Sequence, residues 1–108
     1  MPNLTFYIHS GKMPSAERLA ALSEDCVELC TSVLEAALKN VHVIYVGVQQ
    51  GHGHPVFAEV QYRLEPFRPP EVMNRFAQAL ENTIDRHTGL TARIRCFGYA
   101  ASNIYARN

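Results

Sequence analysis

The sequence contains no long apolar run. None of its apolar stretches approaches the ~20 residues that a membrane-spanning helix requires, so we expect no membrane partner. The first residues, MPNLTFYIHSGK, also lack the basic start, the apolar segment and the small-residue cleavage site of a secretory signal. We therefore expect a cytoplasmic protein.

Surplus charge and paired cysteines are absent as well. Ten Lys and Arg residues balance ten Asp and Glu residues, so nothing in the charge indicates nucleic-acid binding. The three cysteines, an odd number without framework spacing, argue against a secreted disulfide scaffold. Cys26 and Cys30 lie four residues apart and are expected on the packed face of a helix. His52-Gly-His54 has no thiolate or carboxylate partner in its motif, so we expect neither a metal nor a cofactor.

The sequence does contain one structural pattern twice. In the first half, apolar residues alternate over 4–8, which predicts a half-buried strand. They then recur at helical spacing from Ser15, and Asn40 is expected to close this helix. A second strand, rich in β-branched residues, is expected over 41–48.

The second half repeats this order after a glycine-rich connector. Alternation predicts a strand over 56–64, and Pro69-Pro70 suits the start of a helix because proline's missing N–H does no harm there. Gly89 is expected just past the last turn of that helix, followed by a strand over 92–97.

These elements predict a single α/β domain over residues 1–108. Its halves, roughly 1–48 and 55–99, are two β-α-β repeats, and 100–108 is a short tail. We expect one four-stranded sheet with two helices on one face. The other face carries charged and aromatic side chains, which favours a closed homotrimer. A ferredoxin-like β-α-β-β-α-β sandwich fits the same pattern and stays open as an alternative.

The amino terminus carries the main functional hypothesis. A small second residue permits removal of Met1, which would leave Pro2 with a free secondary amine at the start of a strand. An α-amino group has a pKa near ~7.7–8.0, and both an apolar pocket and nearby cations lower it. A neutral amine at cellular pH is a good general base.

The residues around this proline resemble the tautomerase superfamily. PNLTFYIHSGK is similar to the first strand and turn of 4-oxalocrotonate tautomerase, VHVIYV to its second strand, and QQGHGHP to its connector. Residues 101–104, Ala-Ser-Asn-Ile, look like the carboxy-terminal stretch of macrophage migration inhibitory factor. The resemblance implies the tautomerase fold, a homotrimer with sites at subunit interfaces, and Pro2 as the base. The implied reaction is keto–enol proton transfer on a small 2-oxo or 2-hydroxy-unsaturated carboxylic acid, with no cofactor.

The resemblance also implies which side chains hold the substrate carboxylate. Lys12 falls where 4-oxalocrotonate tautomerase has a carboxylate-binding arginine, and His42 falls on a second functional arginine of that enzyme. Arg63 and Arg68 resemble the arginine pair of the cis-3-chloroacrylic acid dehalogenase branch and of malonate semialdehyde decarboxylase, although their spacing here is longer.

Two further arginines lie on the last expected strand. Arg93 and Arg95 share one face of it and match positions that, in macrophage migration inhibitory factor, reach the neighbouring subunit's proline. The resemblance therefore implies that they help to bind the substrate across a subunit boundary.

Two other functions stay open. One is a related proline-dependent decarboxylase, hydratase or dehalogenase acting on a three-carbon acid, which needs a water-activating acidic residue that we do not find between Tyr99 and Asn108. The other is a non-catalytic ferredoxin-like binding or assembly domain.

Overall fold

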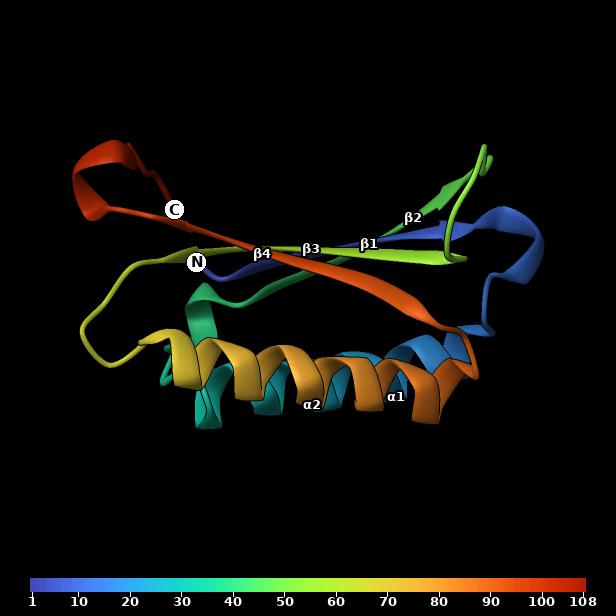
Figure 1. Cartoon of the computed structure of the whole chain (residues 1–108), viewed down its shortest axis with the longest axis horizontal. Helices are drawn as coiled ribbons and strands as arrows, with labels where there is room; N and C mark the ends of the chain where they lie inside the picture. The colour runs from blue at the N-terminus through green and yellow to red at the C-terminus, as the bar shows by residue number, and fades with distance from the viewer.

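The computed structural model describes all 108 residues and shows a sheet layer and a helix layer (Figure 1). Three short 3-10 turns connect the main elements at Ser10–Lys12, Leu38–Asn40 and Ala101–Asn103. The main elements are β1 (Asn3–His9), α1 (Ala16–Ser32), β2 (His42–Val48), β3 (Val56–Arg63), α2 (Pro70–Thr88) and β4 (Ala92–Tyr99).

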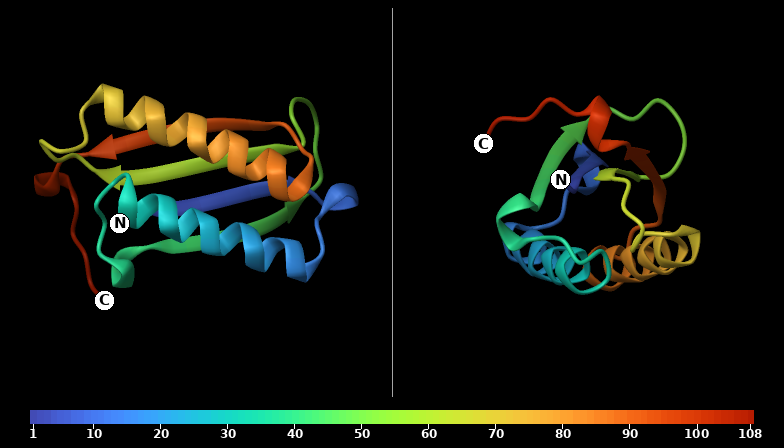
Figure 2. Two further views of the ribbon diagram at one scale, coloured as in Figure 1. Left: turned by 90° about the horizontal axis from the view of Figure 1, so that it is seen from below. Right: turned by 90° about the vertical axis from the view of Figure 1, so that its left-hand side faces the viewer.

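The four strands form one mixed sheet in the order β2-β1-β3-β4. β1 is parallel to β2, β3 is parallel to β4, and the two central strands β1 and β3 are antiparallel. Both helices lie side by side on one face (Figure 2). This confirms the predicted α/β fold of two β-α-β repeats. In each repeat the parallel strands are direct neighbours, so the split β-α-β units of a ferredoxin-like sandwich are excluded.

The core lies between the sheet and the helices. Every second residue of β1 and β3 is buried there, which is the period-2 pattern of a half-buried strand. Cys26 and Cys30 are fully buried on α1 as expected, and burial raises the pKa of each thiol to about 12. The largest core side chains are Phe6, Phe76, Leu4, Ile8, Leu22, Leu34, Leu80 and Ile84.

Most predicted helix ends are confirmed. The Ser15 hydroxyl accepts a hydrogen bond from the Arg18 amide at the start of α1, and Pro69 and Pro70 begin α2. Gly89 follows α2 in the left-handed conformation, with φ of 68°.

The predicted end of the first helix at Asn40 is wrong. α1 ends at Ser32, and Glu35 takes a left-handed φ of 53°, which turns the chain away from the helix axis. Leu34, just before this turn, is completely buried. Leu34 is therefore the last residue of the first helical pattern that packs into the core. Residues 35–41 then lead through a 3-10 turn to the edge strand β2.

The sheet face opposite the helices has no cover within the chain (Figure 1). Tyr7 and Phe57 stack on it with ring centroids 6.0 Å apart. Ile44 on β2 is 50% exposed and Phe97 on β4 is 44% exposed. An exposed apolar surface of this kind is typical of a binding or subunit interface. Neither α1 nor α2 combines the length and the hydrophobicity that a membrane-spanning helix requires.

We predict that Gly89→Ala lowers the free energy of unfolding by about 1 kcal/mol, because a Cβ makes the left-handed backbone costly. Urea denaturation measures this change. Gly51→Ala is the matched control: Gly51 has a negative φ and open space around it, so its variant should stay within about 0.5 kcal/mol of the parent. Equal stability of both variants would contradict the prediction.

Candidate active site

Pro2 lies at the start of a central strand of the sheet. Its carbonyl oxygen accepts a hydrogen bond of 3.1 Å from the His42 amide, so the parallel pairing of β1 with β2 extends to this residue. The Pro2 side chain is almost completely buried. The backbone nitrogen of Pro2 is therefore held by the sheet itself and needs no loop to position it.

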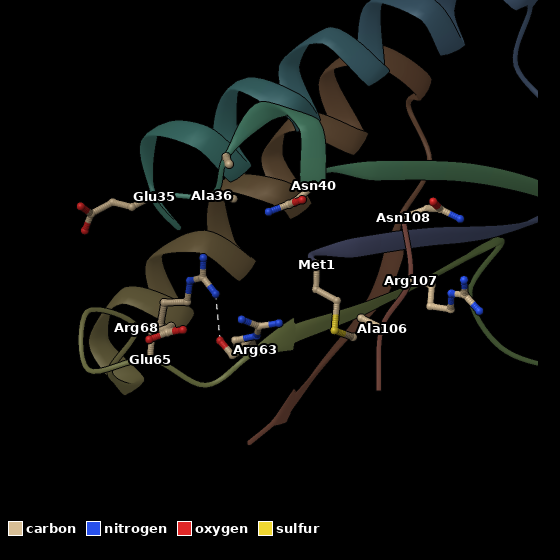
Figure 3. Close-up of a pocket in the computed structure, with 11 residues that line it drawn as sticks. Met1, Glu35, Ala36, Asn40, Arg63, Glu65, Arg68, Ala106, Arg107 and Asn108 are labelled. Atoms are coloured by element: carbon tan, nitrogen blue, oxygen red, sulfur yellow. Dashed lines mark hydrogen bonds between the residues drawn. The ribbon is translucent and has the colours of Figure 1, made fainter. Parts of the chain in front are cut away.

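A cavity of about 350 Å³ opens beside the amino terminus (Figure 3). Met1, Arg63 and Arg68 line it together with the loop that follows α1. In Figure 3, Arg63 and Arg68 lie on one side of Met1, and the tail residues Ala106 and Arg107 lie on the other. An amine and two guanidinium groups therefore share one small space.

The surroundings favour the neutral form of the amino terminus. Partial burial lowers the pKa of the Met1 amine below its usual range, and the positive charges of Arg63 and Arg68 lower it further. Pro2 is buried in the chain that retains Met1, and removal of Met1 would open the Pro2 nitrogen toward the cavity that Met1 now lines. Both causes raise the fraction of free base at neutral pH.

The two arginines beside the amine differ in burial and in hydrogen bonding. Arg68 is only 8% exposed, and its Nε and Nη1 donate hydrogen bonds of 2.8 Å to the carbonyl oxygens of Leu34 and Arg63. Burial lowers the pKa of Arg68, and no carboxylate lies within ion-pair distance of it. Arg63 is exposed, and its guanidinium makes no hydrogen bond or ion pair within the chain. Arg63 is thus free to take an external anion.

His42 lies on the other side of the amino terminus. It is exposed at the start of β2 and lines a second cavity of about 380 Å³, which Met1 also lines. Lys39 and Arg107 add positive charge to this second cavity. The structure therefore brings Pro2, His42, Arg63 and Arg68 to one end of the sheet.

Lys12, Arg93 and Arg95 do not join them within one chain. Lys12 lies past the far end of β1, and the seven residues of that strand span roughly 20 Å. Arg93 lines a cavity with His52 and His54 at the same far end. Arg95 lies on the edge strand β4, where its Nη1 donates to the carbonyl oxygen of Ile94. A second copy of the chain is needed to bring any of the three to Pro2.

The carboxy-terminal tail contributes residues that the sequence patterns do not identify. Residues 106–108 line the cavity that contains Arg63, and residues 104–108 line the cavity that contains His42. The tail turns back toward the amino terminus after a 3-10 turn at Ala101–Asn103 (Figure 2). Only the basic Arg107 could have indicated this role, and nothing local in the sequence specifies the path of the tail.

The structure brings no three His, Cys, Asp or Glu side chains together in a group that could hold a metal ion. Two acidic residues, Glu35 and Glu65, line the same cavity as Met1 and Arg63. A neutral amine in this cavity could accept a proton, and the two neighbouring guanidinium groups could bind an acid.

Solved structures of the tautomerase superfamily share this fold. No protein-family model and no curated protein sequence matches the chain. A member of the cis-3-chloroacrylic acid dehalogenase family is 15% identical with a TM-score of 0.81, over 97% of this chain and 80% of that one. A fused 4-OT symmetric trimer is 18% identical with a TM-score of 0.74, over 92% and 88%. Malonate semialdehyde decarboxylase is 11% identical with a TM-score of 0.75, over 99% and 92%. The chain thus has the tautomerase fold, as the sequence resemblance implied.

We predict that Arg68→Met lowers the free energy of unfolding by about 2–3 kcal/mol, because two carbonyl oxygens lose a charged donor. Arg63→Met is the control and should change stability by less than about 0.5 kcal/mol, since the Arg63 side chain is exposed and unpaired. Urea denaturation of both variants tests this difference. Equal losses would show that the hydrogen bonds of Arg68 do not stabilise the fold.

Proposed function

We propose that this protein belongs to the tautomerase superfamily and is an isomerase that uses Pro2, freed of Met1, as a general base. Its substrate is a small 2-oxo or 2-hydroxy-unsaturated carboxylic acid. The observation that carries the proposal is the amino terminus at a buried strand start, in one cavity with Arg63 and Arg68. The fold of the matched structures, which include a 4-OT, supports it.

The reaction is a proton transfer in two steps. The neutral Pro2 amine removes the hydroxyl proton of the enol, and the electron pair moves into the new carbonyl while the conjugated chain becomes a carbanion equivalent at its far carbon. The protonated amine then returns the proton to that carbon, which leaves the ketone. Arg63 binds the carboxylate and stabilises the negative charge that develops on the enolate. No group from outside the chain is consumed.

The remaining sequence candidates take part through assembly. The exposed face of the sheet, with Ile44 and Phe97, needs a cover, and the fused 4-OT proteins of the same fold are trimers. We propose that three copies form a closed trimer, in which Lys12, Arg93 or Arg95 of one copy approaches the Pro2 site of another. His42 of the same chain flanks that site.

One observation favours a second candidate function. Glu35 and Glu65 line the cavity that holds the amine, and a carboxylate near a proline base can activate water. A hydratase, dehalogenase or decarboxylase acting on a three-carbon acid would use such a group, and malonate semialdehyde decarboxylase has the same fold. As part of either proposal we place the protein in the cytoplasm, where the free thiols of its three cysteines stay reduced.

We predict that Pro2→Ala lowers kcat/KM for phenylenolpyruvate ketonisation by roughly 100-fold or more, because a primary amine on a less rigid residue replaces the base. Ultraviolet absorbance follows the reaction. Mass spectrometry of the parent protein should show a chain that starts at Pro2. A retained Met1, or a Pro2→Ala variant as active as the parent, would refute the proposed base.

We predict that Arg63→Met moves the ascending limb of the kcat/KM–pH profile to higher pH. The free Pro2 amine is the proposed active form. Burial and the Arg63 cation lower the pKa of the Met1 amine at this end of the chain, and we expect Arg63 to act on the Pro2 amine in the same way. Removing the cation should therefore raise the pKa of the Pro2 amine, so that more of it is protonated at a given pH. Arg63→Lys keeps the charge and should leave the limb close to its original position. If the ascending limb of Arg63→Met stayed at the same pH as that of the parent, Arg63 would not influence the pKa of the base.

We predict that Phe97→Arg converts the trimer to monomers, because the charge would lie on the exposed sheet face that the trimer covers. Light scattering after size-exclusion chromatography measures the mass. Tyr105→Arg is the control, since Tyr105 is 96% exposed at the tail and is not on the sheet. A parent protein that runs as a monomer would contradict the proposed assembly.

A further inference from the structure

Arg68 carries features that a substrate-binding arginine does not need. Its guanidinium has five N–H groups, and two of them are used on backbone carbonyl oxygens of Leu34 and Arg63. Only 8% of the residue is exposed, and its Cζ lies 5.1 Å from the centre of the Phe67 ring. Two hydrogen bonds and the contact with the Phe67 ring therefore fix the position of the guanidinium group.

The two carbonyl groups belong to segments that determine the shape of the cavity. Arg63 is the last residue of β3, and the loop to α2 begins after one further hydrogen bond, from the Leu64 amide to the Tyr99 carbonyl of β4. Leu34 precedes Glu35, whose left-handed φ turns the loop after α1 toward the same cavity. Arg68 thus connects the carbonyl of a core residue, Leu34, to the backbone from which the Arg63 side chain extends. Figure 3 shows the hydrogen bond between Arg68 and Arg63.

We infer that Arg68 is a positioning residue, which acts on the substrate by fixing Arg63 beside the amine, and that Arg63 rather than Arg68 binds the carboxylate. This inference rests on the proposed function, because it concerns the same site. The burial of Arg68 and its two backbone hydrogen bonds support this positioning role. Arg63, which is exposed and has no internal partner, supplies the two parallel donors that a carboxylate needs.

A double-mutant cycle on binding separates positioning from direct contact. The probe is phenylpyruvate, and its Kd is measured by NMR titration for the parent and for Arg63→Met, Arg68→Met and the double variant. Arg63→Met should weaken binding roughly tenfold, the scale of one lost charge-assisted contact. If Arg68 acts through Arg63, adding Arg68→Met to Arg63→Met weakens binding no further. Losses that multiply to roughly a hundredfold would show that Arg68 touches the ligand itself and would overturn the inference.

Arg68→Lys provides a second readout and also covers the case in which Arg68→Met does not fold. A lysine keeps the positive charge, but its single ammonium group lacks the planar fork that spans two carbonyl oxygens. The inference predicts a Kd as weak as that of Arg68→Met, with the ascending limb of the pH profile unchanged. Full recovery of binding by lysine would show that only the charge matters, and would overturn it.

The outcomes for this inference and for the proposed function are distinguishable. The cycle reads ligand binding, so it decides the role of Arg68 even if the protein does not ketonise phenylenolpyruvate or if Pro2→Ala is fully active. Those two results count against the proposed function alone. A parent protein that does not bind phenylpyruvate would remove the carboxylate-binding role of Arg63 and, with it, the role of Arg68.

Discussion

The position of the amino terminus in the middle of the sheet is the constraint on which the rest of the site depends. β1 pairs with β2 on one side and with β3 on the other, so its first residues cannot move without breaking both ladders. The sheet thus fixes the backbone of Pro2 and the end of β3, where Arg63 lies, in one frame. A protonated amine and a guanidinium group repel each other, so the folding free energy that holds them close also favours the neutral form of the amine.

The fold could be predicted from the sequence, whereas much of the site could not, because the site depends on contacts between distant parts of the chain. Strand alternation and helical spacing are local patterns, and they predicted the four strands, both helices and the termini at Ser15 and Gly89. The early end of α1 escaped prediction because Glu35 takes a left-handed conformation that is uncommon for a residue with a side chain.

The site residues divide in the same way. Arg63 and Arg68 were expected near Pro2, and the structure places both beside the amino terminus. The difference in burial and hydrogen bonding between Arg63 and Arg68 could not be predicted. The partners of Arg68 are backbone carbonyl groups 34 and 5 residues away, and every residue has such a group, so the sequence does not mark them. The contribution of the tail was missed for a related reason: residues 104–108 have no periodicity that fixes their direction. Lys12, Arg93 and Arg95 lie away from Pro2 within one chain, and only the proposed trimer would bring them to it.

The burial of Pro2 constrains the order of events during synthesis. An aminopeptidase that removes Met1 must bind the first residues in an open, extended form, whereas the folded chain hydrogen-bonds the Pro2 carbonyl into the sheet. If Pro2 is the base, the initiator residue must leave while the nascent strand is still unpaired at the ribosome. A recombinant protein that keeps any residue before Pro2 would then lack the free secondary amine on which the proposed reaction depends.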